Sequence, residues 1–181
     1  SYNVAIGRDA LLNATSNSNV AVGHSALNAN TSGALNTAVG ANALDANTEG
    51  NNNTALGQNS LTTNTTANNN TGLGYNALAV NSTGTSNVAV GSLALDANST
   101  ANNSVAVGYS ALTTNTTGSR NTTVGSMSLE QNTTGNYNIA MGYQALENNT
   151  TGGNNVGLGY KSLEANNASN NTAVGFEALK A

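Results

Sequence analysis

Glycine recurs along the whole chain at a nearly constant spacing, and this period constrains the fold more than any other feature. Successive anchoring glycines are 16 residues apart in the first and last intervals and 17 residues apart in the eight between them. They are Gly7, Gly23, Gly40, Gly57, Gly74, Gly91, Gly108, Gly125, Gly142, Gly159 and Gly175. Such a period indicates a repeat protein in which each unit packs on its neighbours. We therefore treat residues 1–181 as one repeat domain of eleven coils.

Each repeat has the same internal order of residue types. A leucine stands four positions after every anchoring glycine, and Ala or Ser precedes it. Before the glycine, the segment Asn-(Val/Thr)-Ala-(Val/Leu)-Gly alternates β-forming and small residues, which favours a short strand. We expect the Ala-Leu segment to form a second short strand, and polar runs such as Asn115 to Gly118 to close the coil as turns. The sequence thus predicts an all-β, parallel β-solenoid with two short strands per coil.

A single coil is too small to fold alone, so the coils must stack. Ordering each residue costs about 1–2 kcal/mol, whereas the few large apolar side chains of one repeat return about 1.5–3 kcal/mol each. Stacking adds a parallel hydrogen-bond ladder, and eleven coils make a rod about 50 Å long. It also aligns one asparagine per coil, whose amides can bond from coil to coil. We expect an interior ladder of Asn30, Asn47, Asn64, Asn81, Asn98, Asn115, Asn132, Asn149 and Asn166.

The composition argues against a helical fold and against several classes of partner. Of the 181 residues, 36 are Asn and 20 are Gly, and no helical periodicity persists beyond a few residues. There is no Cys to supply a thiolate or a disulfide. The net charge is −4, without a basic cluster for nucleic acid or an anionic membrane. Because no apolar run approaches the roughly 20 residues of a membrane span, we expect neither nucleic-acid binding nor membrane insertion.

The repeat resembles two groups of fibre proteins. The pattern Asn-Thr-Ala-Val-Gly-Tyr-x-Ala-Leu-x-x-Asn-Thr-Thr-Gly is nearly complete from Ser104 to Gly118 and from Asn138 to Gly152. It is similar to repeats in fibre-like phage tail proteins and their bacterial surface relatives. The shorter core from Asn3 to Gly7 also resembles the head repeat of trimeric autotransporter adhesins. The resemblance covers practically the whole chain and implies a left-handed parallel β-roll, assembled as a homotrimer in an attachment structure.

Three local patterns suggest site chemistry, but the repeat explains them better. Gly72 to Ala77 fits the dinucleotide fingerprint G-x-G-x-x-A, yet no helix is predicted to follow it. Asp45 to Gly50 is similar to the start of a calcium-binding loop, but Leu56 stands where the loop requires Glu. His24, the only histidine, has no Ser-His-Asp arrangement around it. We therefore predict no catalytic residues, no cofactor, no metal site and no enzymatic activity.

Two sets of side chains are candidates for a binding surface. Aromatic residues follow the glycine in five coils and form a broken stripe that offers flat rings to a glycan or a receptor, with packing between coils or subunits as the alternative. These are Tyr75, Tyr109, Tyr143, Tyr160 and Phe176. Hydroxyl residues form a row on the polar turn, as in ice-binding solenoids, although consecutive Thr residues point to opposite faces of a strand. The threonines of this row are Thr31, Thr48, Thr65, Thr116, Thr133 and Thr150.

These observations predict a rigid, non-enzymatic rod that self-associates as a homotrimer. We expect it outside a cell, on a cell surface or on a virion, where it presents an adhesive surface to a receptor or glycan. Neither end carries a recognisable polar cap, so a longer parent chain or an end-to-end filament is a second expectation. Ice binding through the threonine row is a third. The acidic column of Glu130, Glu147 and Glu164 must be solvated, since like charges repel at this spacing.

Overall fold

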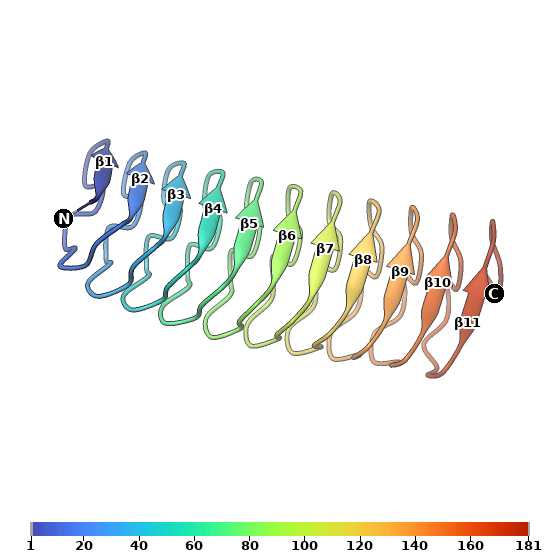
Figure 1. The fold of residues 1–181 in the computed structure, drawn as a ribbon. Helices are drawn as coiled ribbons and strands as arrows, with labels where there is room; N and C mark the ends of the chain where they lie inside the picture. Colours follow the sequence, from blue (N-terminus) through green and yellow to red (C-terminus); the bar gives the residue numbers. More distant parts are fainter. Residues whose placement is uncertain (1, 181) are drawn as a thin grey trace.

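The structure is a computed structural model that describes residues 2–180. It confirms an all-β parallel solenoid, in which eleven strands follow one another along a rod (Figure 1). The strands are β1 (Val4–Ile6), β2 (Val20–Val22), β3 (Thr37–Val39), β4 (Thr54–Leu56), β5 (Thr71–Leu73), β6 (Val88–Val90), β7 (Val105–Val107), β8 (Thr122–Val124), β9 (Ile139–Met141), β10 (Val156–Leu158) and β11 (Thr172–Val174). Within the described part of the chain, no helix is long and apolar enough to cross a membrane.

All eleven strands belong to one parallel sheet, and each strand pairs only with its neighbours in the sequence. The register is the same from coil to coil, so that Ala21, Ala38 and Ala55 lie in one column. With neighbouring strands about 4.8 Å apart, ten intervals give a rod about 48 Å long. The constant glycine period is therefore the length of one coil.

The two faces of the sheet have different surroundings. From β2 to β11 the middle residue of each strand is buried inside the coil, while its two neighbours point outward and are partly exposed. The middle residue is Ala in most strands, Gly in β5 and β10, and Thr123 in β8. These small side chains face a buried column of leucines, one per coil from Leu11 to Leu163. The core is thus a thin Ala-Leu layer that runs the length of the rod.

The prediction of a second strand in each coil is wrong. After the glycine the chain makes two consecutive turns, closed in the second coil by hydrogen bonds from Ala26 N to Gly23 O (3.4 Å) and from Asn30 N to Leu27 O (3.2 Å). Ser25 and Leu27 have φ angles of 54° and 51°, in the left-handed region, which a strand cannot contain. The segment still bonds to the next coil, as Leu27 N donates to Ala43 O at 3.0 Å.

The sequence indicates these turns, because β-branched residues are absent from the positions where the chain turns. The left-handed conformation recurs at three positions in the coil: two and four residues after the glycine, and five before it. None of these positions holds Val, Ile or Thr in any described coil, although the strands are rich in all three. β-branched side chains are the least tolerant of positive φ. The absence of β-branched residues from these positions is therefore evidence in the sequence against a second strand in the Ala-Leu segment.

The anchoring glycine allows the coils to approach closely at the corner after each strand. Gly91 has a φ of 134°, and a Cβ placed on it would lie 2.4 Å from the carbonyl oxygen of Gly108 in the next coil. Any side chain here would both strain the backbone and push the coils apart. Glycine therefore recurs once per coil because a side chain does not fit at this corner.

The predicted asparagine ladder is confirmed for all but its last member. Each side-chain amide donates to the side-chain oxygen of the preceding coil, for example from Asn47 Nδ2 to Asn30 Oδ1 at 2.8 Å. The amide also donates to the carbonyl three residues on in its own coil, here Gly50 O at 3.1 Å. These asparagines are fully buried from Asn30 to Asn149. Asn166 does not join, because its turn is one residue shorter and its amide bonds to Ala168 O instead (3.1 Å).

A second asparagine ladder, which we did not predict, lies at the start of the strands. Asn36 N donates to Asn19 Oδ1 of the preceding coil (2.9 Å), and Asn36 Nδ2 donates to Gly50 O of the next coil (2.7 Å). The pattern continues through most coils, with Ser104 as the exception. The recurrence of Asn four positions before the glycine was a sufficient signal. Together the two ladders pair most of the buried polar groups at the chain turns, and Asn149 Oδ1, at the end of the first ladder, has no partner among the described residues.

Candidate interaction surface

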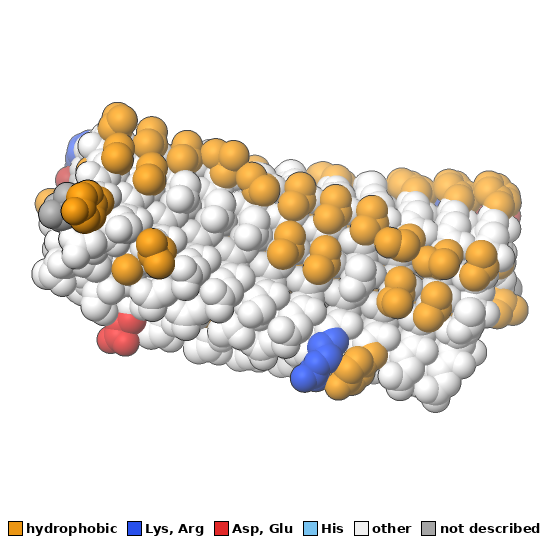
Figure 2. Space-filling view, viewed as in Figure 1, with side chains coloured by type: hydrophobic (Ala, Val, Ile, Leu, Met, Phe, Trp, Pro, Cys, Tyr) orange, Lys and Arg blue, Asp and Glu red, His pale blue; other side chains and the backbone are white. Residues whose placement is uncertain are grey.

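The outward face of the sheet carries a continuous apolar stripe, which we call the strand face. It consists of the first and third residues of every strand, and it runs along the rod in rows (Figure 2). The row next to the glycine contains only Val, Leu, Ile or Met, whereas the other row holds Val or Ile in six strands and Thr in five. Leu56 in β4 and Met141 in β9 are 46% and 43% exposed. One chain therefore leaves a regular apolar face in solvent.

The predicted aromatic stripe, which we call the aromatic column, lies at the residue after each anchoring glycine, beside the strand face. It has two different parts. In the last three coils the rings are stacked, with centroids 5.6 Å apart for Tyr143 and Tyr160 and 5.0 Å apart for Tyr160 and Phe176. These distances lie within the range of favourable offset stacking. Tyr75 and Tyr109 instead stand two coils apart, with Ser92 at the same position between them. Both are about half exposed, at 50% and 51%.

The predicted threonine row lies on the bends that close the coils, outside the strands. Its hydroxyl groups are already hydrogen-bond donors within the rod. Thr116 Oγ1 donates to Thr133 O and Thr133 Oγ1 to Thr150 O, both at 3.1 Å, and Thr31, Thr48 and Thr65 do the same. Ice binding through this row stays a prediction, in which the hydroxyls would be left to act as acceptors.

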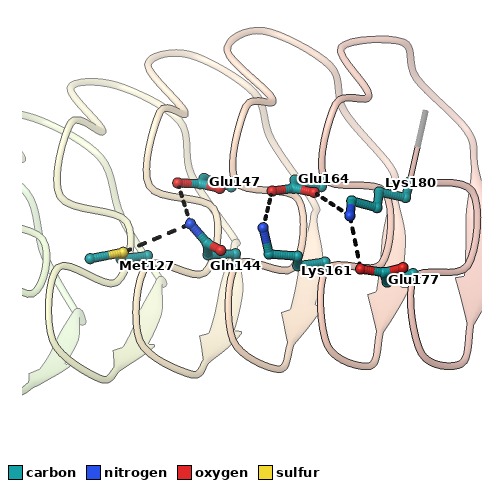
Figure 3. Close-up of polar contacts among 7 residues, drawn as sticks. All are labelled: Met127, Gln144, Glu147, Lys161, Glu164, Glu177 and Lys180. Carbon is teal, nitrogen blue, oxygen red and sulfur yellow. Dashed lines mark hydrogen bonds and ion pairs between the residues drawn. The ribbon is translucent and has the colours of Figure 1, made fainter.

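A charged cluster lies on the turn side of the last coils (Figure 3). Lys161 Nζ is 2.7 Å from Glu164 Oε1, and Lys180 Nζ is 2.8 Å from Glu177 Oε1 and 3.9 Å from Glu164 Oε2. The hydrogen bond to Glu164 raises the pKa of Lys161. Ion pairs of this kind near the surface contribute little to stability, because solvent screens the charges. The cluster therefore holds its two lysines and two glutamates in pairs.

The acidic column is less solvated than the sequence led us to expect. Glu130, Glu147 and Glu164 are half-buried, and the latter two gain polar partners that the repeat pattern did not reveal. Glu147 accepts a hydrogen bond from Gln144 Nε2 at 2.9 Å, while Glu164 pairs with the lysines. Burial raises the pKa of Glu130 above its ordinary value of 4.5, and the Glu147 carboxylate raises it further. Glu147 and Glu164 are therefore each paired with a side chain of their own coil.

The remaining singled-out residues form no site together. His24 is exposed at the corner, and its charge opposes the rise in the pKa of Asp45 that burial causes. Sequence reasoning missed a pair on the polar side, where Arg120 Nη1 donates to Tyr137 Oη at 2.9 Å and the guanidinium lies 5.3 Å from the ring centroid. Over residues 2–180 we find no pocket and no group of three His, Cys, Asp or Glu side chains that could hold a metal ion.

The surface of residues 2–180 thus has extended rows of side chains along the rod and no cleft. Comparisons of the chain with family models, with curated proteins and with solved structures found no match. The strand face, the aromatic column and the charged cluster are the features from which a function can be argued.

Proposed function

We propose that the protein is a structural rod that self-associates through its strand face as a homotrimer. The observation that carries this proposal is the continuous apolar stripe on the outward side of all eleven strands. An exposed apolar face of this regularity marks a protein interaction surface, since isolated chains seldom expose large contiguous apolar patches. A second copy of the same chain is the natural partner, because its own stripe has the same length and the same coil spacing.

A cyclic assembly fits this geometry. Closed rotational symmetry is the usual arrangement of identical chains, and it would bring the strand faces together along a common axis while the polar turns stay in water. The resemblance to trimeric adhesin heads supports three chains. The rod would serve as a non-enzymatic spacer or attachment element, exposed outside a cell or on a virion. Its paired strands and two internal ladders give the stiffness that such a role needs.

The oligomeric state of purified protein tests the proposal. Light scattering coupled to size-exclusion chromatography should give three times the chain mass. The double variant Val90→Asp with Val107→Asp places two charges on the strand face and should give a monomer with unchanged circular dichroism, because burying these carboxylates between chains is strongly unfavourable. Thr100→Asp with Thr117→Asp is the matched control, since these exposed residues lie on the turns of the same coils.

The same measurement separates the alternatives. A wild-type monomer over a wide concentration range would refute self-association. Growth into long particles as concentration rises would support end-to-end stacking in a filament in place of a closed trimer. If the control variant dissociates as readily as the strand-face variant, the stripe is not the interface.

A further inference from the structure

The two parts of the aromatic column differ by one missing ring, and this difference suggests a binding site. In the last coils, Tyr160 occupies the space between Tyr143 and Phe176 and stacks on both at 5.6 and 5.0 Å. In the middle of the rod, Tyr75 and Tyr109 stand at the same column positions as Tyr143 and Phe176, but Ser92 replaces the central ring. The gap between Tyr75 and Tyr109 is therefore the space that one aromatic ring would fill.

The backbone holds the two walls of this gap in register. Leu93 N donates to Tyr75 O at 2.9 Å and Ser110 N donates to Ser92 O at 3.0 Å, so adjacent coils are bonded to one another at this point. Two strand spacings place the two column positions about 9.5 Å apart. A flat guest centred between the rings would then lie about 4.8 Å from each, which is inside the 4.5–7 Å range of stacked rings. The filled ladder shows that this column accommodates such a stack.

The residues at the column position in the gap and on either side of it are polar and uncharged. Ser92 stands at the column position between the two tyrosines, and Asn76, Leu93 and Ser110 follow these three residues along the chain. The flanking coils carry Gln58 and Ser126 at the column position. Rings with a polar handle suit a guest that is apolar on its faces and polar at its rim. These features favour a neutral guest over a charged one.

We propose that the Tyr75–Ser92–Tyr109 gap binds one neutral pyranose ring whose hydroxyl groups are all equatorial, as in a β-linked glucose chain. Such a ring presents axial C–H groups on both faces, so each face can contact a tyrosine, while its rim hydroxyls reach Ser92 and the phenol groups. An axial hydroxyl, as in mannose, would bring an oxygen against one tyrosine face and leave it without a partner. This site goes beyond the proposed rod function and does not depend on the number of chains.

Saturation-transfer NMR with cellotetraose tests the proposal, with mannotetraose as the matched control ligand. We expect cellotetraose to bind the wild-type protein with a Kd on the order of 1 mM, and Tyr109→Ala to weaken it about tenfold by removing one stacking wall. Ser92→Phe should abolish binding, because it fills the rung with a ring that five other coils already tolerate at this position. Phe176→Ala, in the filled ladder, should leave binding unchanged.

Three results would overturn the proposal. Failure of cellotetraose to bind wild-type protein, equal binding of mannotetraose, or full binding to Ser92→Phe would each exclude a sandwich in this gap. Ser92→Phe should melt no lower than wild type and keep its oligomeric mass. If it binds no sugar but dissociates the assembly, the gap holds an aromatic side chain of a second copy. Loss of the trimer in the strand-face variant with sugar binding intact would separate this site from the rod proposal.

Discussion

The two faces of the sheet are built from the same three-residue strands, yet they tolerate different residues. On the inward face the middle position is Ala, Gly or, once, Thr123, because the leucine column lies directly opposite. On the outward face Val, Thr, Ile, Leu and Met all occur. Variation in size is thus excluded where the coil closes on itself and allowed where it meets solvent or another chain. The inward residues therefore determine how the coil closes, and the outward residues determine what the rod can contact.

The largest effect is expected inside the coil, at the asparagine ladder. Asn132 Nδ2 donates to Asn115 Oδ1 at 2.8 Å, and Asn149 Nδ2 donates to Asn132 Oδ1 at 3.0 Å. Asn132→Ala should lower the free energy of unfolding by about 2–3 kcal/mol, because Asn115 Oδ1 becomes a buried acceptor without a donor and a cavity opens beside it. Chemical denaturation of the monomeric strand-face variant measures this change.

The adjacent residue provides the control for this ladder. Gln131 is exposed, so Gln131→Ala should shift the unfolding midpoint by less than about 0.5 kcal/mol. Equal effects at the two positions would mean that the interior ladder contributes no more than a surface side chain. The interior ladder would then not be what holds the coils together.

A smaller effect of opposite sign is expected at the one hydroxyl on the inward face of the strands. Thr123 Oγ1 is buried and has no hydrogen-bond partner among the described residues. Thr123→Val replaces it with a methyl group of the same shape and should stabilise the protein by about 1 kcal/mol, since an unpaired buried hydroxyl is unfavourable. Differential scanning calorimetry should show a higher melting temperature.

The neighbouring Thr122→Val sharpens the same comparison, because Thr122 points outward and is half exposed. It should change the stability of the monomer little. A destabilised Thr123→Val variant would show that the inward hydroxyl has a partner, such as an ordered water.

The smallest effect is expected on the outward side of the turns and depends on pH. Burial, reinforced by Glu147, raises the pKa of Glu130 in the folded protein, so its protonated form is favoured there. Its contribution to stability is therefore fully present below the ordinary pKa of 4.5 and is lost as pH rises through the folded value. Glu130→Gln should flatten this part of the pH profile and stabilise the protein slightly at neutral pH.

Thermal melts from pH 4 to 7 would measure the change. Asp45 and Asp96 also have pKa values raised by burial, so a pH dependence of the same sign should remain in the Glu130→Gln variant. A wild-type protein that gains stability as pH rises through this range would contradict the assignment.

Much of the fold followed from the repeat pattern. The period predicted the coils, the alternation before each glycine predicted the strands, and the asparagine column predicted an interior ladder. The second strand was a wrong prediction because the Ala-Leu segment was judged by its apolar residues, whereas the left-handed residues beside them determine its path. The aromatic column and its break at Ser92 are visible in the sequence, but only the structure shows that Tyr160 stacks on both Tyr143 and Phe176.

By itself, the sequence determined the unit of this protein: a coil of 17 residues that closes at a glycine, buries one leucine and stacks on its copies. It could do so because every coil repeats the same local requirements, so the signal is read eleven times. Only the tertiary structure decided which face of each strand is inside, which hydroxyls are already bonded and which charges are paired. These properties depend on side chains from neighbouring coils, and a pattern within one repeat does not contain them.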